Sequence, residues 1–436
     1  MLKFVDLFAG IGGLRLGFEQ GIASLGLKGE CVLASEINPE ACQVYAQNFC
    51  HVPEGDIRQI QALPEHDVLL AGFPCQSFSY AGKKQGFGEI RGTLFFEIMR
   101  LLDTYKPKVI ILENVRGLTT HDHGKTLATI EHEIQLRGYS FSKFILNSVN
   151  FGLPQNRVRV YMVGVLNASP QFNLISDLGP KDSHAYNALQ LNSFNFNDLP
   201  PKVKDILEDN PDSCFNCSPE FVRALNKVVQ GNFNELHGVR LIDYRGGNSI
   251  HSWELGLRGE CSEDEIQLMN LLITERRKKK FGQHQDGKQL TSEQIYSFFP
   301  HSNLSNILES LVEKQYLKKI KKHYKPVSGN FSFEVYKFLD PDKVSVTLVA
   351  SDANRIGVYH QGRVRRITAR EAARLQGFPD NFQLHSSLKK AFYQLGNSVS
   401  INVVKTVTEE VIKKTYSHLN LQESGLPYSS PKFNKR

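Results

Sequence analysis

The sequence predicts an α/β fold in which a doubly wound, mostly parallel sheet is joined to a second, variable domain. In the first 165 residues, short apolar runs alternate with stretches whose apolar residues recur at helical spacing. The 436 residues also exceed the roughly 250 to 300 over which one core usually grows. Between 167 and 200 the alternation gives way to Asn, Ser, Asp and Pro, which indicates a boundary.

The predicted elements follow in a regular order. Strands are expected at 3–8, 31–36, 67–73, 109–114 and 158–165, with helices at 38–49, 92–102 and 125–137. Later helical stretches at 264–277 and 292–320, followed by a basic hairpin-like run, suggest a winged-helix insertion at 262–325. We therefore expect a first domain at 1–168 completed by 385–416, a variable domain with its hinge at 169–384, and a flexible tail at 417–436.

Composition narrows the class of protein. Lys and Arg exceed Asp and Glu by 52 to 45, a net charge of +7, which modestly favours a polyanionic partner. Neither an apolar run of membrane-spanning length nor a secretory signal is recognisable, so we expect a cytoplasmic protein. The odd number of cysteines, seven, fits free thiols, and Cys214 and Cys217 form a lone CxxC without further ligands, so no metal is expected.

A glycine-bearing turn follows the first predicted strand in the segment DLFAGIGG, residues 6–13. Glycines let a ligand approach the backbone, and the first turn of the next helix offers free N–H groups to a carboxylate. Glu36 ends the second strand, where its side chain is placed to accept hydrogen bonds from ribose hydroxyls, and Asp56 is placed to accept one from an adenine amino group. The turn predicts a nucleotide-like cofactor but does not separate NAD from S-adenosylmethionine.

A cysteine follows a proline in the segment GFPCQSFS, directly after the third strand. Ligands bind at the carboxyl ends of strands in open α/β sheets, so Cys75 is placed for nucleophilic chemistry. Behind it, residues 80–88 are rich in glycine and include Lys83 and Lys84, which predicts either a hinged loop whose lysines meet phosphates or an ordinary solvated loop.

The chain resembles the cytosine-5 DNA methyltransferase family of the bacterial type II restriction-modification class. The resemblance lies in six segments in the family's order: DLFAGIGG, GFPCQSFS, LENVRGL, QNRVRVYMVG, TAREAARLQGFP and QLGNSVS. It implies that S-adenosylmethionine is the methyl donor and that Cys75 attacks cytosine C6. It also implies that Glu113 binds the cytosine amino group and N3, that Arg159 reaches O2, and that Arg157 holds the site together.

The resemblance completes the set of expected site residues. Those expected to bind the cofactor are Asp6, Phe8, Gly10, Gly12, Gly13, Glu36, Asp56, Ile57, Pro74 and Asn397. Those expected to contact DNA are Gln76, Ser79, Lys83, Lys84, Arg91, Thr347 and Leu348. Asn397 also fits the N-cap of a following helix. Further candidates for DNA contact are the basic runs 276–280 and 318–322 and the polar run 245–248.

The resemblance also implies partners. A base inside a duplex is out of reach, so the target cytosine is expected to rotate into the pocket, and the variable domain is expected to recognise a short double-stranded sequence. The compact set of segments suggests a monomer on DNA that protects host DNA from a matching restriction endonuclease. Open alternatives are methylation of cytosine in transfer RNA, a DNA-binding repressor without catalysis, and NAD-dependent oxidoreduction.

Overall fold

The computed structural model describes residues 1–74, 94–176, 201–282, 288–327 and 333–423, the side chains of 417–423 excepted. Its chain divides into two compact units. One unit comprises Met1–Pro201, Val346–Ala350 and Ala372–Arg436, and the other comprises Lys202–Ser345 and Ser351–Glu371. Compared with the expected boundaries, the first unit therefore also takes in residues 346–350 and 372–384, which lie far from it in sequence.

The first unit is built on a six-stranded sheet in the order β2-β1-β3-β4-β6-β5. Its strands are β1 Leu2–Leu7, β2 Gly29–Ser35, β3 Val68–Ala71, β4 Val109–Val115, β5 Ser142–Asn147 and β6 Val158–Val165. Strands β1 to β4 pair in parallel, whereas β6 runs antiparallel to both β4 and β5. The prediction of a mostly parallel α/β sheet is confirmed. The edge strand β5 was not predicted from the sequence.

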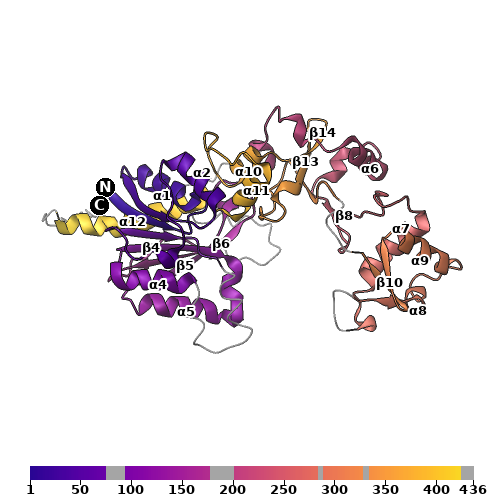
Figure 1. The fold of residues 1–436 in the computed structure, drawn as a ribbon, viewed down its shortest axis with the longest axis horizontal. Coiled ribbons are helices and arrows are strands. Elements are labelled where there is room, and N and C mark those ends of the chain that lie inside the picture. Colours follow the sequence, from indigo (N-terminus) through magenta and orange to yellow (C-terminus); the bar gives the residue numbers. More distant parts are fainter. Residues whose placement is uncertain (75–93, 177–200, 283–287, 328–332, 424–436) are drawn as a thin grey trace, which may run out of the picture. The chain divides into compact units, whose positions relative to one another are not determined.

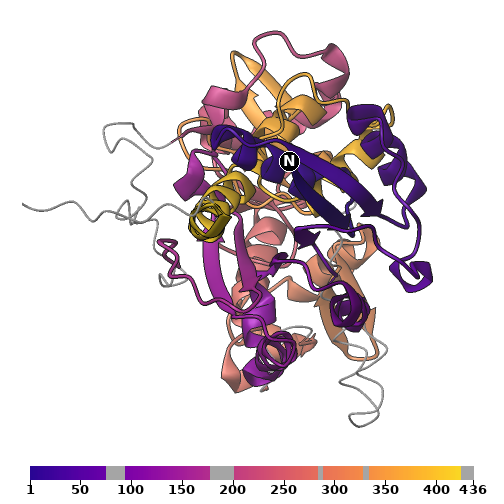
Figure 2. The ribbon, with the colours of Figure 1, turned by 90° about the vertical axis from the view of Figure 1, so that its left-hand side faces the viewer.

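Helices cover both faces of this sheet (Figures 1 and 2). The helices of this unit are α1 Gly13–Ser24, α2 Pro39–Phe49, α4 Leu94–Tyr105, α5 Lys125–Gln135, α11 Leu388–Asn397 and α12 Ile401–Glu423. Successive strand residues point to opposite faces, so Phe4 packs with α1 and α12 while Val5 packs with α4 and α5. The segment expected to be a flexible tail from 417 instead continues α12 to Glu423.

Helix α1 packs closely on α12 because three glycines recur on one side of it. A methyl group added at Gly17 would lie 2.5 Å from the Val404 Cβ, and one added at Gly21 would lie 2.7 Å from the Lys405 carbonyl oxygen. Gly13 similarly faces Ser398. The C-terminal helix therefore completes the first unit through contact distances that only glycine permits.

Among its described residues, the second unit has two clusters of buried apolar side chains and two sheets. One sheet has the order β14-β13-β12-β7-β8, and the other has the order β10-β11-β9. The strands are β7 Arg240–Leu241, β8 Ser249–Ile250, β9 Leu290–Thr291, β10 Leu317–Ile320, β11 His323–Pro326, β12 Lys337–Leu339, β13 Ile356–His360 and β14 Arg363–Arg366. The helices are α6 Pro219–Val229, α7 Glu263–Glu275, α8 Ser292–Tyr296 and α9 Leu304–Glu313, while α10 Ala369–Leu375 spans the division between the units.

The segment TAREAARLQGFP opens with a buried network at the start of α10. Thr368 and Glu371 form reciprocal capping hydrogen bonds of 2.8 and 3.0 Å. The Glu371 carboxylate also pairs in bidentate fashion with Arg365, with nitrogen to oxygen distances of 2.7 and 2.8 Å, and both side chains are buried. A buried ion pair needs such complete hydrogen bonding, so each partner keeps the other in place. No helix in the described part of the chain is long and apolar enough to cross a bilayer.

We predict that Gly17→Ala destabilises the first unit by about 1–3 kcal/mol, the usual cost of overpacking a well-filled core. Alanine is the better helix former, so a loss of stability would have to come from contact with Val404 and the Ile401 carbonyl. The measurement is the free energy of unfolding from urea titration. Gly55→Ala is the matched control, since nothing lies within 4 Å of the added methyl group. Equal stability of both variants would contradict close α1–α12 packing.

Candidate active site

A cavity of about 300 Å³ lies at the carboxyl edge of the first unit's sheet, where open α/β sheets bind ligands. The turn after β1, the residues after β2, Gly72 after β3 and Glu113 near the end of β4 all reach it. Its lining is completed by the end of α11 and the residues that follow: Tyr393, Gln394, Asn397, Ser398 and Val399. The C-terminal segment thus closes a site that the first 115 residues begin.

The residues expected to bind a cofactor separate into two groups. Those that line the cavity are Phe8, Gly10, Gly13, Glu36 and Asn397. Those that do not line it are Asp6, Gly12, Asp56, Ile57 and Pro74. Asp56 pairs with Arg58 and caps the following turn, Ile57 is buried in the core, and Gly12 faces the rings of Phe49 and Tyr45. Asn397 is the last residue of α11 and not the N-cap of α12, because Ser400 precedes that helix.

Glu36 holds the glycine turn to the end of β2. Its two carboxylate oxygens accept hydrogen bonds of 2.8 Å from the backbone N–H groups of Gly10 and Asn38. Each oxygen retains a further acceptor position, and the side chain lies at the cavity wall. Phe8 reaches the wall from a left-handed backbone conformation with φ of 56°. Both side chains are therefore oriented by the backbone before any ligand binds.

The sequence analysis missed several cavity residues, of which Ile37, Tyr393 and Gln394 offer the most to a ligand. Ile37 is 70 % exposed and Tyr393 is 51 % exposed, so two large apolar surfaces stand open at the cavity. Gln394 is buried, and its Nε2 has no hydrogen-bond partner among the described residues. Ile37 could have been predicted from the sequence, because it directly follows Glu36 at the end of the second strand. Together they offer apolar walls and a free amide donor to a ligand.

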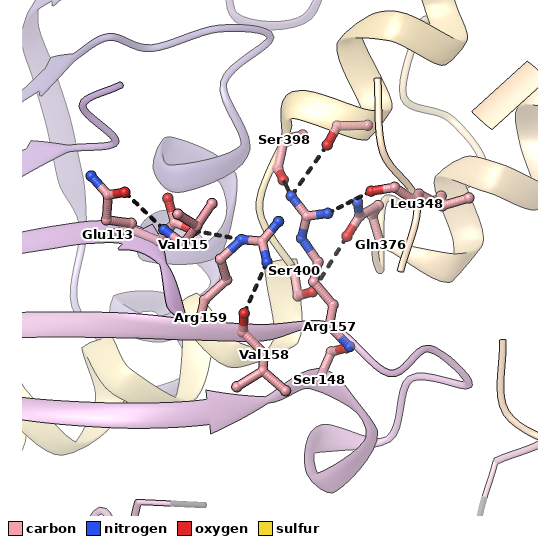
Figure 3. Close-up of polar contacts among 12 residues, drawn as sticks. Glu113, Val115, Ser148, Arg157, Val158, Arg159, Leu348, Gln376, Ser398 and Ser400 are labelled. Carbon is pink, nitrogen blue, oxygen red and sulfur yellow. Dashed lines mark hydrogen bonds and ion pairs between the residues drawn. The ribbon is translucent and has the colours of Figure 1, made fainter. Parts of the chain in front are cut away.

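Glu113 and Arg159 form an ion pair between neighbouring strands. The Arg159 Nε lies 3.2 Å from the Glu113 Oε1, and the strands β4 and β6 that carry them are hydrogen-bonded (Figure 3). Burial raises the pKa of Glu113 above its usual range, although Arg159 and Arg157 oppose the shift. The carboxyl group is thus able to carry a proton at a higher pH than an exposed glutamate.

Arg157 is directed away from Glu113 and binds backbone carbonyls (Figure 3). Its guanidinium donates to the Leu348 oxygen at 2.9 Å, to the Gly396 oxygen at 3.3 Å and to the Ser398 oxygen. Arg157 precedes β6 and Arg159 is its second residue, a spacing that puts both side chains on one face. They meet different groups there: Arg159 pairs with Glu113, and Arg157 joins segments distant in sequence.

Gln155 and Gln376 extend this network. The Gln155 amide donates to the Leu375 oxygen at 2.8 Å and accepts the Leu348 N–H at 2.9 Å. Gln376 donates to the Leu395 oxygen at 3.0 Å. Thr347 donates to the Asn156 carbonyl. Leu348 was expected to contact DNA, but its side chain is fully buried and therefore has a packing role in this structure.

Asn114 holds the strand end that leads to the expected nucleophile. Its amide donates a 2.8 Å hydrogen bond to the Phe73 carbonyl, and both residues are buried. The remaining expected residues lie outside the described residues: Cys75, Gln76, Ser79, Lys83, Lys84 and Arg91. Within the described residues, no group of three or more His, Cys, Asp or Glu side chains is arranged to hold a metal ion.

Comparison with known proteins places this site in context. The family model described as C-5 cytosine-specific DNA methylase matches residues 2–413. The Type II methyltransferase M.BanI of Aneurinibacillus aneurinilyticus is 55 % identical over 418 residues, covering 96 % of this chain and 97 % of the relative. M.HgiCI of Herpetosiphon aurantiacus is 57 % identical over 415 residues, covering 95 % and 98 %.

Solved structures share the fold. The S. pombe Dnmt2 methyltransferase has a TM-score of 0.52 at 16 % identity, covering 96 % of this chain and all of that chain. The Entamoeba histolytica methyltransferase EhMeth has a TM-score of 0.51 at 17 % identity, covering 95 % and 98 %. At such identities the likeness concerns the fold alone.

We predict that Asp6→Asn flattens the pH dependence of stability. Burial raises the pKa of Asp6 to about 7, although Arg15 and Tyr45 oppose the shift. The unfolded value is about 3.9, so folding is favoured by this group below pH ~4 and the contribution is lost as the pH rises through ~7. Between pH ~5 and ~7 the free energy of unfolding of the wild type should fall by up to about 1.4 kcal/mol per pH unit because of this group. The variant should not show this fall.

The measurement is urea unfolding across that pH range. Asp122→Asn is the matched control, because Asp122 is an exposed carboxylate whose left-handed backbone conformation asparagine tolerates. Identical pH profiles for the wild type and both variants would contradict a protonated Asp6.

Proposed function

The chain belongs to the C-5 cytosine-specific DNA methylase family and is a DNA cytosine-5 methyltransferase, and we propose that it methylates one cytosine of a short double-stranded sequence through the Cys75 thiolate. The observation that carries the chemical part of the proposal is the buried Glu113, which lines the cavity and pairs with the partly buried Arg159. A carboxyl group that carries a proton beside a cation can protonate a ring nitrogen of a neutral heteroaromatic base. The protonated ring then accepts a nucleophile more readily.

In the proposed reaction, the Cys75 thiolate forms a bond to cytosine C6 while Glu113 donates a proton to N3. The raised pKa of Glu113 supports this role, because a general acid works best when its pKa lies near the working pH. Arg159 orients the Glu113 carboxyl and is placed beside it to bind O2. The addition leaves an enamine, whose C5 would take the methyl group as the methyl–sulfur bond of S-adenosylmethionine breaks and S-adenosylhomocysteine leaves. A base then removes the C5 proton, the C6–sulfur bond breaks to release the Cys75 thiolate, and N3 returns its proton to Glu113.

S-adenosylmethionine, bound in the cavity, would supply the methyl group as an electrophile on sulfur. The cavity fits such a ligand in size and in chemistry. Glu36 would accept hydrogen bonds from the ribose hydroxyls, and the exposed face of Ile37 offers apolar surface to the adenine ring. The unpartnered Gln394 amide would donate to the ligand's carboxylate. Asp56 would need to give up part of its pairing with Arg58 to reach the adenine amino group.

The substrate we propose is duplex DNA with the target cytosine rotated out of the helix. The expected contacts from Gln76, Ser79, Lys83, Lys84, Arg91 and Thr347 belong to this proposal, with the variable unit recognising the sequence and the enzyme acting as a monomer. The Type II names of the bacterial relatives support pairing with a restriction endonuclease that cuts the same sequence. Such DNA lies in the bacterial cytoplasm, where we place the enzyme.

We predict that the wild type transfers labelled methyl groups from S-adenosylmethionine to unmethylated genomic DNA, that Cys75→Ser abolishes the transfer, and that Glu113→Gln lowers its rate roughly 10²–10⁴-fold, the usual contribution of a general acid. Bisulfite sequencing of the product should show methylated cytosines within one short sequence.

Cys50→Ser is the matched control, since it removes an exposed thiol that does not line the cavity and should leave the rate unchanged. Transfer RNA is offered as a parallel substrate. Label on adenine, label on RNA alone, or full activity of Cys75→Ser would refute the proposed reaction.

A further inference from the structure

Residues 262–327 form a small module with the element order of a winged-helix fold. The order is α7, β9, α8, α9, β10, β11, and β11 lies between β9 and β10 in an antiparallel sheet. Figure 1 shows α7, α8, α9 and β10 gathered together. In helix-turn-helix proteins of this kind, the second helix of the pair lies in the DNA major groove. By that order α9 is the corresponding helix, and the β10–β11 hairpin is the wing.

One face of α9 is fixed by the module's own core. Leu304, Ile307, Leu308 and Leu311 are buried at helical spacing, and they pack with α7 and with Tyr316 and Tyr324 of the hairpin region. The opposite face is exposed and begins with neutral polar residues: Ser302, Asn303, Ser305 and Asn306. Asparagine and serine side chains both donate and accept hydrogen bonds, which is the chemistry that base edges require.

The wing is strongly basic, and its sequence contains no acidic residue to balance the lysines. Residues 314–327 contain six lysines and no Asp or Glu. Lys314 is used structurally, since it lies 2.7 Å from the buried Glu265. Lys318, Lys321 and Lys322 are exposed, and in the described part of the chain none of them lies within ion-pair distance of a carboxylate. Lys321 occupies the hairpin turn with φ of 57°.

Most side chains of the other basic run, residues 276–280, make contacts within the protein. Arg276 is only 5 % exposed, and Arg277 donates to the Tyr244 carbonyl at 2.7 Å. Lys278 and Lys280 both pair with Glu275. Of the two basic runs that the sequence offered, the structure therefore leaves the wing free to meet an external anion and directs most of the first into internal contacts.

We propose that residues 262–327 bind double-stranded DNA as a winged helix, with the first turns of α9 in the major groove and the wing lysines on the phosphate backbone. The inference rests on the proposed function, in that DNA is the substrate. Glu309 and Glu313 place negative charge on the exposed later turns of α9, so the first turns are the ones that approach the duplex. Asn303 and Asn306 are the residues placed to contact bases.

The test compares two full-length triple variants that lose the same charge. K318Q/K321Q/K322Q removes the wing lysines, and K3Q/K28Q/K106Q removes three exposed lysines at the amino edge of the first unit's sheet. Binding to a duplex that contains the methylated sequence is measured by fluorescence anisotropy over a range of salt. The slope of log affinity against log salt should fall by up to roughly 0.9 for each lost phosphate contact in the wing variant only.

A second arm tests base recognition. N303A/N306A should keep the salt slope of the wild type but methylate additional sequences in genomic DNA, as found by bisulfite sequencing. Circular dichroism and the unfolding midpoint of both variants establish that the module remains folded. Wild-type salt slope in the wing variant, an equal loss in the control triple variant, or unchanged sequence selectivity in N303A/N306A would overturn the assignment.

The outcome is separable from the failure of the proposed function. If the wild type transfers no methyl group to DNA, the reaction proposed above is wrong. The salt slopes are then measured on a duplex of arbitrary sequence, because phosphate contacts do not depend on sequence, and they still report whether the wing binds DNA. If the wild type methylates DNA normally and the wing variant has the same KM for DNA, only the assignment of the winged helix is wrong.

Discussion

The arrangement of the first unit depends on a buried arginine that binds backbone. Arg157 donates to carbonyl oxygens at positions 348, 396 and 398, which lie some 190 to 240 residues along the chain from it. Hydrogen bonds from a charged donor contribute roughly 1.5–3 kcal/mol each, and their loss would leave buried carbonyls unpaired. Gln155, two residues earlier, adds contacts to positions 348 and 375. One short segment before β6 thus gathers the parts of a discontinuous unit.

The same segment connects this scaffold to the chemistry. Arg157 directly precedes β6 and Arg159 lies within it, so the guanidinium that orders the C-terminal segments is two residues from the one paired with Glu113. The ordered C-terminal segments in turn supply Gln394, Asn397 and Ser398 to the cavity wall. The cofactor side and the base side of the proposed site are therefore both held by residues 157–159, at the start of β6.

Burial raises the pKa of two acidic groups of this unit above the usual range. Glu113 and Asp6 both lie where water is excluded, and for both the pKa is raised even though an arginine is near. In Asp6 the consequence concerns stability, and its second oxygen has no partner among the described residues. In Glu113 the consequence concerns chemistry, because the side chain lines the cavity. In the second unit, by contrast, the lysines of the wing are exposed. Positive charge at the surface attracts a polyanion over a long range.

The sequence by itself determined many of the local elements and, through six short segments, the family. Patterns of apolar residues predicted five of the six strands of the first unit's sheet and the helices α2, α4 and α5. Asn38 caps α2 by accepting from the Ala41 N–H, as its residue type suggests. Strand β5 was not predicted. It is an edge strand in which only three of six residues are buried, so its pattern of apolar residues is weak. The resemblance carried by six segments identified the family, since a nucleophile, a carboxyl group and a glycine turn each sit in a recognisable local context.

Only the tertiary structure decided how those groups are used. Leu348 is buried, Arg276 is internal, Asp56 is paired with Arg58, and Ile37 stands open at the cavity. The division into units also follows from contacts of Gln155 and Arg157 that join residues about 200 positions apart. The physical reason is that helices and strands form from neighbours along the chain, whereas burial, pairing and exposure depend on which distant segments fold against each other.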